Sequence, residues 1–356
     1  MDHLSKATKW AGVMGAGLLL LSSLPGCVAS VPEQPATSVT FVMNTVVEYE
    51  LYGPDEQAEE AIQAIDQALR DLENRMSLYL EDSEIQRLNA AAGNGEWIPL
   101  SEDTFDLLKR AKEFGDASGG IFDITIAPLT ELWGVTSEHP QVPSSEEIQQ
   151  ALALVDYRGL ELDESLQAAR LTHAGMAVDL GGAAKGYACD VARKVAQQYE
   201  ITSGYLSIGG NLMVIGQKPD GKQFTFGLRD PRGSANEYIA TISLPDSTMA
   251  TSGDYERFFE QDGIRYHHIL DPDTGYPSNG GLMSVSVVTP DGALADFLST
   301  TLFILGRDAA LEQLNNIPGC GLILVDTDKN VYLSDSLKEW FTPADSTGSY
   351  QFEVPA

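Results

Sequence analysis

Residues 251–277, TSGDYERFFEQDGIRYHHILDPDTGYP, concentrate more chemical groups than any other stretch, and we expect the rest of the chain to be arranged around them. Glycine-marked turns break this run, which predicts a β-hairpin. The chain has only five histidines, and two of them, His267 and His268, are adjacent here. Because successive side chains of a strand point to opposite faces, one ring can face a site while the other faces solvent or the core.

Both histidines are candidate catalytic groups, because a neutral imidazole near a hydroxyl substrate is the commonest general base. Either one, taken alone, is equally well explained as a structural histidine with satisfied hydrogen bonds. Ser252 lies in no Gly-x-Ser-x-Gly motif, which argues against a serine-hydrolase site. The run that starts at Asp271 is not a calcium-binding EF-hand, because its twelfth residue is Leu282 where the loop needs glutamate.

The first 26 residues have the pattern of a secretory signal and are not expected to belong to the fold. A short basic start precedes an apolar run, residues 11–21, that is too short for a permanent membrane helix. The run leads to Leu-Pro-Gly-Cys ending at Cys27, which resembles the lipobox of bacterial lipoproteins, with cleavage before Cys27 and lipid on its sulfur. The alternative is an ordinary cleaved signal with an incidental cysteine.

Charge limits the partners that the surface can attract. The chain carries 52 Asp and Glu residues against 22 Lys and Arg residues, a formal net charge of −30. Such a surface repels nucleic acid and anionic lipid, so no nucleic-acid partner is expected. It also repels an anionic nucleotide, so a phosphate site must be made locally by backbone amides, a lysine or a metal ion. Cys189 and Cys320 belong to no Cys/His cluster, which argues against zinc, and whether they pair stays open.

Strand and helix signals alternate irregularly, without a repeat of fixed period. Period-2 alternation and β-branched residues predict strands, some paired in hairpins, at residues 39–51, 97–100, 160–171, 177–180, 204–216, 224–230, 237–244, 284–289 and 322–333. The first of these is expected to kink near Met43-Asn44. Apolar residues at three-to-four spacing predict helices at residues 55–73, 101–118, 145–155, 181–199 and 293–306, with a further helical start at residue 83. We expect residues 121–128 to be extended and residues 249–254 to form a polar turn.

Two of these helices carry candidate groups for phosphate and metal binding. Gly181–Gly186, GGAAKG, leads from a strand into a helix, which presents backbone N–H groups to a phosphate, but close packing that tolerates only glycine explains it equally well. In the apolar helix of residues 293–306, Asp296 and Thr300 are four positions apart and share one face. Their oxygen atoms suit Mg²⁺, although helix capping by Asp and a bond from Thr to its own helix also account for them.

Two further residues have open interpretations. Asp123 is flanked by apolar residues, so it is either buried with a partner or faces a ligand. Tyr79 follows a helix in a polar segment, where it either stacks on a planar ring or packs against the protein.

Eight short stretches, taken in order, resemble the FAD:protein FMN transferase family, also called ApbE. They are Met43–Thr45, Met76–Tyr79, Ser83–Ile85 with Leu88-Asn89, Phe122–Thr125, Asp179–Gly186, Ile208–Asn211, Thr251–Pro277, and Ala295-Asp296 with Ser299-Thr300. The resemblance implies an exported bacterial enzyme that takes FAD and Mg²⁺, transfers FMN through a phosphoester bond to a Thr or Ser of an acceptor protein, and releases AMP. One departure is Asn44, where the family often has glycine.

The same resemblance implies roles for individual residues. Those that would line the FAD site are Met43, Tyr79, Ile121, Phe122, Asp123, Gly181, Lys185 and Leu270. Asp296, Thr300 and the backbone carbonyl of Ala184 would bind Mg²⁺. His268, which precedes Ile-Leu-Asp-Pro, would be the base that activates the acceptor hydroxyl, and His267 would lie on the opposite face.

The resemblance also implies an α+β fold, with mixed β-sheets packed with helices in a single compact, two-lobed, T-fold-like domain. The expected boundaries are a signal peptide at residues 1–26, a lipidated N-terminus and flexible tether at 27–38, the catalytic domain at 39–342 and a C-terminal tail at 343–356. The lipid on Cys27 would hold the protein on the periplasmic side of a bacterial membrane.

Two other functions remain open from the sequence. One is a Mg²⁺-dependent FAD pyrophosphatase that releases FMN and AMP with the same residues. The other is a periplasmic flavin-binding lipoprotein without turnover. A candidate base at His268 beside metal-binding candidates argues against the second, because binding alone needs no base.

Overall fold

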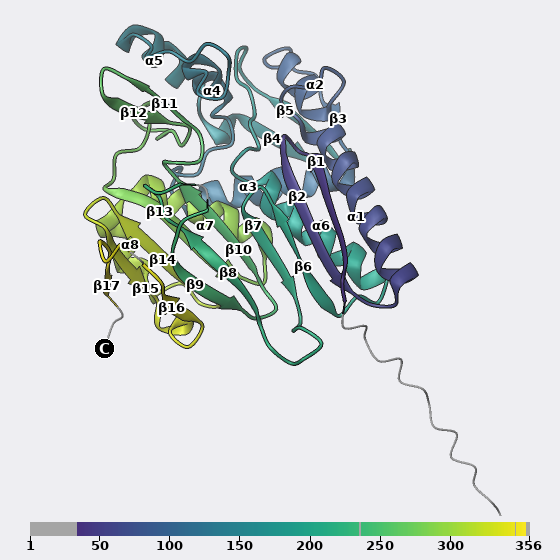
Figure 1. Ribbon diagram of the computed structural model, residues 1–356. Helices are drawn as coiled ribbons and strands as arrows, with labels where there is room; N and C mark the ends of the chain where they lie inside the picture. Colours follow the sequence, from purple (N-terminus) through teal and green to yellow (C-terminus); the bar gives the residue numbers. More distant parts are fainter. Residues whose placement is uncertain (1–33, 235, 346, 354–356) are drawn as a thin grey trace, which may run out of the picture. The chain divides into compact units, whose positions relative to one another are not determined.

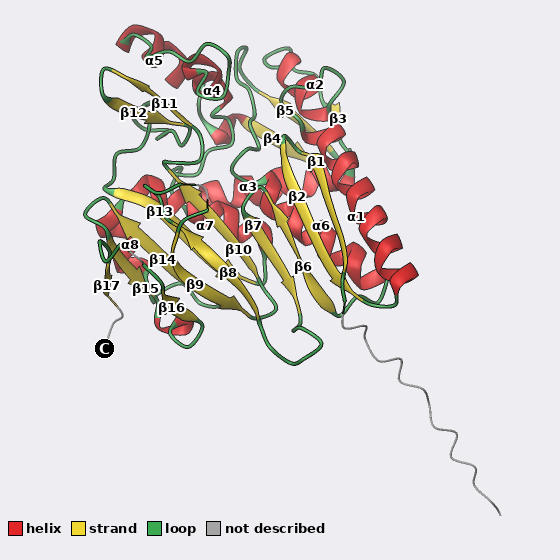
Figure 2. Ribbon diagram, viewed as in Figure 1, coloured by secondary structure: helices red, strands yellow, loops and turns green. Residues whose placement is uncertain are grey.

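A nine-stranded β-sheet is the middle layer of the structure, with helices on one face and a smaller sheet on the other (Figures 1 and 2). This computed structural model describes residues 34–353, apart from residues 235 and 346. All neighbouring strands are antiparallel except the last pair. From edge to edge the sheet consists of β1 (Ala36–Val42), β2 (Thr45–Tyr52), β6 (Ser203–Ile208), β7 (Asn211–Ile215), β10 (Thr248–Gly253), β13 (Leu282–Thr289), β14 (Gly321–Asp326), β15 (Asn330–Leu333) and β17 (Gln351–Glu353).

Helices α1 (Asp55–Met76), α3 (Glu102–Ala117), α6 (Ala184–Gln198), α7 (Gly292–Leu305) and α8 (Arg307–Gln313) cover one face of this sheet (Figure 1). The buried residues of α1 recur every three or four positions, so they form one apolar stripe toward the sheet. The helix α7 is apolar on almost all sides because it packs against β10 and β13 below and contacts both α6 and α8. Its polar residues are therefore placed in the interior.

The opposite face is covered by a three-stranded sheet of β8 (Phe224–Arg229), β9 (Tyr238–Leu244) and β16 (Phe341–Pro343). Apolar residues of this sheet, including Phe224 and Ile242, pack against residues of the large sheet such as Val214 and Ile323. The centre of the large sheet is thus buried on both faces. All eight residues of β13 are buried, which explains why that strand contains no charged residue.

A smaller cluster carries the histidine hairpin. The strands β11 (Phe258–Gln261) and β12 (Ile264–His267) pack beside α4 (Ala127–Trp133) and α5 (Ser145–Leu152). The ring of Trp133 is 5.5 Å from that of Tyr266, and its indole N–H donates to the carbonyl of Gly275 at 2.8 Å. The remaining elements are α2 (Glu84–Ala90), the sheet of β3 (Ile98–Pro99), β5 (Ala168–Leu171) and β4 (Leu160–Asp163), and the 3-10 helices Tyr157–Gly159 and Asp335–Leu337.

The expected α+β class is confirmed, and most predicted elements are present. Residues 39–51 are not one strand, however. They form the β1–β2 hairpin, whose two-residue turn at Met43 and Asn44 has positive φ at both positions, 55° and 54°. This is the turn type whose twist matches paired strands. Such turns usually carry glycine, and because Met43 and Asn44 are not glycine, the sequence suggested a kink rather than a turn.

Three other expectations are corrected. Residues 249–254 are not a turn, because β10 runs through them as an inner strand. Residues 121–126 and 177–180 form no strand and are joined by an isolated parallel bridge between Ile126 and Ala177, and α4 begins at Ala127. Ordered structure also extends beyond both expected boundaries, since β1 begins at Ala36 and β17 lies within the expected tail.

Candidate active site

Gly186 and Gly292 bring the first turns of α6 and α7 into direct backbone contact. A Cβ atom on Gly186 would lie 2.1 Å from the carbonyl oxygen of Gly292, and one on Gly292 would lie 2.3 Å from the carbonyl oxygen of Gly186. Both distances are far below van der Waals contact, so only glycine fits at either position. Close packing therefore accounts for part of the glycine-rich stretch.

Asp296 lies where α6, α7 and β7 meet, and it is only 5 % exposed. Its Oδ2 accepts a hydrogen bond from the N–H of Gly186 at 2.6 Å, and its Oδ1 accepts one from the side-chain amide of Asn211 at 2.8 Å. These two donors fix the orientation of the carboxylate. Each of its oxygens keeps a second acceptor direction for a ligand.

Thr300 follows Asp296 by one helical turn and faces the start of α6. Its Oγ1 is 3.2 Å from Oγ of Ser252, and a Cβ atom on Gly182 would lie 3.4 Å from the same oxygen. The described residues contain no group of three or more His, Cys, Asp or Glu side chains that could hold a metal ion. A Mg²⁺ ion here would therefore rely on the Asp296 carboxylate together with neutral hydroxyl and carbonyl oxygens, a donor set that suits a hard cation.

The backbone amides before α6 are only partly available to a ligand. The N–H of Gly181 donates to Oδ1 of Asp179 at 2.8 Å, so Gly181 has no amide to offer a phosphate in this arrangement. Within the described part of the chain, no acceptor bonds the N–H groups of Gly182 and Lys185. The ammonium of Lys185 makes one long contact, 3.4 Å, with the carbonyl of Gly181. Two amides and one ammonium thus remain for an anion at the N-terminus of α6.

His268 directly follows β12 and is half-buried. Its backbone N–H and its Nδ1 lie 3.1 Å and 3.2 Å from the carbonyl oxygen of Arg257. Because a carbonyl can only accept, Nδ1 carries the ring proton and Nε2 carries the free lone pair. Burial, followed by the nearby Lys185 ammonium, lowers the pKa of His268 to about 3. The ring is therefore neutral near pH 7, as a general base must be.

His267 is buried, and both of its ring nitrogens are engaged. Its Nε2 donates to the carbonyl of Ser278 at 2.8 Å, and its Nδ1 accepts from the N–H of Ile269 at 3.2 Å. Its ring also packs edge-on against Phe303, with the centroids 5.4 Å apart. Burial lowers the pKa of His267, so it too is neutral. These contacts give it a structural role.

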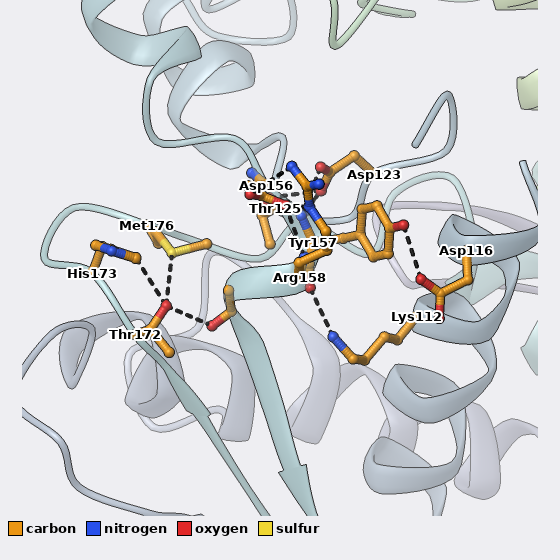
Figure 3. Close-up of polar contacts among 11 residues, drawn as sticks. Lys112, Asp116, Asp123, Thr125, Asp156, Tyr157, Arg158, Thr172, His173 and Met176 are labelled. Atoms are coloured by element: carbon orange, nitrogen blue, oxygen red, sulfur yellow. Dashed lines mark hydrogen bonds and ion pairs between the residues drawn. The ribbon is translucent and has the colours of Figure 1, made fainter. Parts of the chain in front are cut away.

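Asp123 anchors a loop (Figure 3). Its Oδ1 accepts from the N–H and the hydroxyl of Thr125 at 2.7 Å and 2.6 Å, and its Oδ2 accepts from the N–H of Tyr157 at 2.8 Å. Tyr157 is itself held, because its hydroxyl donates to Asp116 and its carbonyl accepts from Lys112. Burial raises the pKa of Asp123. Of the two interpretations of this residue, burial with partners is the one observed.

The ring of Phe122 belongs to the core. It is 4 % exposed and packs against Phe114 and Phe297, with centroid distances of 5.6 Å and 4.9 Å. Only the backbone of Phe122 is left to meet a ligand, and the adjacent Ile121 is half-buried. Tyr79, by contrast, is 67 % exposed, so its ring is free to stack on a planar group.

Met43 and Leu270 sit on turns of the backbone. Met43 lies in the β1–β2 turn, which touches the β6–β7 turn, because a Cβ atom on Gly209 would be 2.4 Å from Oγ1 of Thr45. The β6–β7 turn leads into Asn211, so Met43 lies at the Asp296 end of the large sheet. Leu270 is buried and forms an isolated bridge with Pro277. The roles of these residues in FAD binding stay predictions.

Three residues of this site did not stand out as site residues in the sequence. Asn211 orients Asp296, Ser252 contacts Thr300, and Asp179 holds the turn before α6. A usable signal existed for Asn211, which is the first residue of the otherwise apolar strand NLMVI, all of it buried. Burial raises the pKa of Asp179, as at other carboxyls held inside a site.

The family model of the ApbE family matches residues 43–324 of the chain. The chain belongs to the ApbE family. Relatives named FAD:protein FMN transferase come from Treponema pallidum, 30 % identical with 90 % of this chain and 92 % of the relative covered, and from Klebsiella pneumoniae, 32 % identical with 86 % and 93 % covered.

Solved ApbE structures have the same fold. The ApbE protein of Thermotoga maritima superposes with a TM-score of 0.80 at 34 % identity, and covers 86 % of this chain and 99 % of its own. The flavin transferase ApbE of Vibrio cholerae gives a TM-score of 0.76 at 27 % identity, with the same coverage. A variant of the latter with one histidine replaced by glycine gives 0.74 at 25 % identity.

The two cysteines in the described part of the chain are not paired with each other. Cys189 and Cys320 are free thiols, and burial raises the pKa of both. Cys27, the expected lipidation site, lies outside the described residues. Among residues 34–353, with residues 235 and 346 left out, no helix is long and apolar enough to cross a membrane.

Proposed function

We propose that this protein is an FAD:protein FMN transferase, which moves FMN from FAD to a threonine or serine hydroxyl of an acceptor protein and releases AMP. The observation that carries the proposal is the neutral ring of His268 with Nε2 free, in the electrostatic range of Lys185 at the N-terminus of α6. The names of the relatives support the substrate class. A site that only stored flavin would need no free proton acceptor.

The proposed reaction is one displacement at phosphorus. The acceptor oxygen forms a bond to the phosphorus of the FMN half, the bond from that phosphorus to the bridging oxygen breaks, and AMP leaves with the bridging oxygen. The hydroxyl proton passes to Nε2 of His268. Lys185 and the free amides of Gly182 and Lys185 stabilise the negative charge of the phosphates, which the acidic surface cannot do.

A magnesium ion fits the oxygen atoms that converge between α6 and α7. Asp296 and Thr300 would hold it with the carbonyl of Ala184, and Asn211 keeps the carboxylate in place. When bound, the ion would neutralise charge on the pyrophosphate and favour departure of AMP. Because Asp296 is already hydrogen-bonded in the fold, the site needs little reorganisation to accept a cation.

We also propose that the protein is attached to a membrane by a lipid. A lipid on Cys27 would attach the protein to the periplasmic side of a bacterial membrane, and β1 begins nine residues later. The support is the lipobox-like sequence that follows an apolar run. Labelling with a lipid precursor tests this, since a Cys27→Ala variant would lose the label.

The transfer assay is direct. Purified protein, FAD and Mg²⁺ are mixed with the acceptor protein of the Vibrio cholerae relative, and covalent flavin fluorescence is read on a denaturing gel. We expect a fluorescent acceptor band and stoichiometric AMP. Free FMN with an unlabelled acceptor would instead identify a pyrophosphatase, and intact FAD would contradict both activities.

The metal site has its own test. We expect Asp296→Ala to lower transfer by on the order of 10²-fold or more and to abolish its response to added Mg²⁺, because the one carboxylate among the proposed magnesium ligands is lost. Circular dichroism must accompany the assay, since the variant leaves the buried donors of Gly186 and Asn211 without a partner. A folded Asp296→Ala protein with a normal Mg²⁺ titration would exclude this residue as a metal ligand.

A further inference from the structure

Arg257 is the cross-strand neighbour of His268. The register of the β11–β12 hairpin pairs Phe258 with His267, so the next pair outward is Arg257 with His268. The hydrogen bond from the N–H of His268 to the carbonyl of Arg257, 3.1 Å long, continues the same ladder. Side chains of directly opposed residues project from the same face of a hairpin, with Cβ atoms about 5 Å apart. The side chain of Arg257 therefore projects from the same face of the hairpin as that of His268.

The Arg257 guanidinium has no ion-pair or hydrogen-bond partner among the described residues, and its side chain is exposed. In a chain with 52 acidic residues this is uncommon, since Arg87 is the only other described arginine without an ion pair. The charge of Arg257 nevertheless reaches the site. It acts on the carboxyl of Asp179 and on the ring of His268.

Three positive groups thus act near His268. Lys185 stands in the first turn of α6, Arg257 stands opposite His268 on the hairpin, and both charges act on the His268 ring. Neither Lys185 nor Arg257 has a carboxylate within ion-pair distance among the described residues, and the N–H groups of Gly182 and Lys185 are without an acceptor there. An unpaired cation at an exposed position is solvated by water and stays available to an anion that enters the space. A doubly charged pyrophosphate is such an anion.

We propose that Arg257 is a further catalytic residue, whose guanidinium contacts the phosphate of FAD that is transferred, together with Lys185. The inference rests on the proposed function and deepens it. The planar guanidinium donates two parallel hydrogen bonds to non-bridging oxygens of the reacting phosphate. Charge on those oxygens changes as the acceptor oxygen arrives and AMP departs, and the guanidinium would stabilise that charge.

The test replaces only the side chain, because every substitution keeps the carbonyl that orients His268. We expect Arg257→Gln to raise the Kd of FAD about tenfold and to lower kcat/KM of transfer by on the order of 10²-fold. FAD affinity is measured by quenching of flavin fluorescence, without acceptor and without turnover. Added guanidinium ion should restore part of the rate of Arg257→Ala.

The matched control is Arg87→Gln, which removes another exposed, unpaired arginine from α2, a helix far from the histidine hairpin (Figure 1). We expect it to change both constants less than about twofold, which separates a local contact from the effect of net charge. Parent-like FAD affinity and rate in Arg257→Gln would overturn the inference.

A second outcome would also overturn it. If Arg257→Gln kept its FAD affinity but shifted the acid limb of the pH–rate profile upward, Arg257 would act only on the His268 ring. The proposed function fails differently, because the unmodified protein would then produce no labelled acceptor at all.

Discussion

Each ring nitrogen of His267 has a partner, whereas Nε2 of His268 has none among the described residues. This difference makes His267 a structural residue and leaves His268 as the proposed base, although the two are identical and adjacent in sequence. Strand alternation predicted that they would separate. It could not tell which of them would keep a free nitrogen, because the partners, Ser278 and Arg257, come from turns on either side.

We expect His268→Ala to lower transfer by about 10²- to 10⁴-fold, the range of a general base, while FAD binding stays within about twofold of the parent. Rates come from the gel assay and affinity from flavin fluorescence. His173→Ala is the matched control, since His173 is exposed and its ring bonds only the neighbouring Thr172 among the described residues. Transfer at the normal rate by His268→Ala would remove this residue as the base.

The rate of transfer should not fall near pH 6.5, where an ordinary histidine becomes protonated. The pKa of His268 is lowered from 6.5 to about 3, so its ring is neutral throughout the range from pH 8 to pH 5. We expect kcat/KM to stay level across that range and to fall only in stronger acid, once the ring is protonated. Initial rates in buffers of equal ionic strength test this. A drop centred near pH 6.5 would contradict it.

At the scale of elements, the site depends on how closely two helices approach. The spacing of Asp296 and Thr300 could be derived from helical periodicity alone. The contact between Gly186 and Gly292 could not, because it joins helices far apart in the chain. The same holds for Asn211 and Ser252, which reach the site from β7 and β10.

The secondary structure of β10 was predicted wrongly because it depends on tertiary contacts. The strand β10, MATSG after Thr248, looks like a turn because its residues are small and polar. It is a strand because it pairs along its whole length with β13 and is covered by α7. The hydroxyl of Ser252 then reaches Ser299 and Thr300 of α7. Residue propensities alone cannot predict that β13 and α7 lie beside this segment.

We expect Gly186→Ala to destabilise the protein by about 1–3 kcal/mol, since its methyl group forces α6 away from α7. Transfer should fall further than stability alone requires, because the N–H of Gly186 would leave Asp296. Urea unfolding and Mg²⁺ titration measure the two effects. Lys194→Ala, at an exposed position of α6, serves as the control. Unchanged stability in Gly186→Ala would mean that the helices do not make this contact.

At the scale of the molecule, the C-terminal residues complete the large sheet. The strand β17 pairs with β15, and Tyr350 before it is 6 % exposed and bonds Asp230 through its hydroxyl. The sequence suggested a tail because residues 343–349 are small and polar. The structure shows that apolar residues beyond them, such as Phe352, still pack against the core.

We expect truncation before Tyr350 to lower the free energy of unfolding by about 2–3 kcal/mol, the amount that burial of one large aromatic side chain contributes. FAD binding at low temperature should persist, because the site residues lie elsewhere. Thermal unfolding of the truncated chain measures the change. A chain that ends at Glu353 keeps β17 and is the control. Equal stability of both chains would show that β17 adds nothing.

The two edges of the nine-stranded sheet are formed by β1 and β17, the first and last strands of the described chain. The sheet therefore cannot pair all of its strands, or form its second edge, until almost the whole polypeptide has been synthesised. Pairing of β2 with β6 alone joins Val47 to Ile208, across a long intervening segment. Closure of such distant contacts is slow, so we expect the chain to fold after synthesis, in milliseconds to seconds, rather than strand by strand as it emerges.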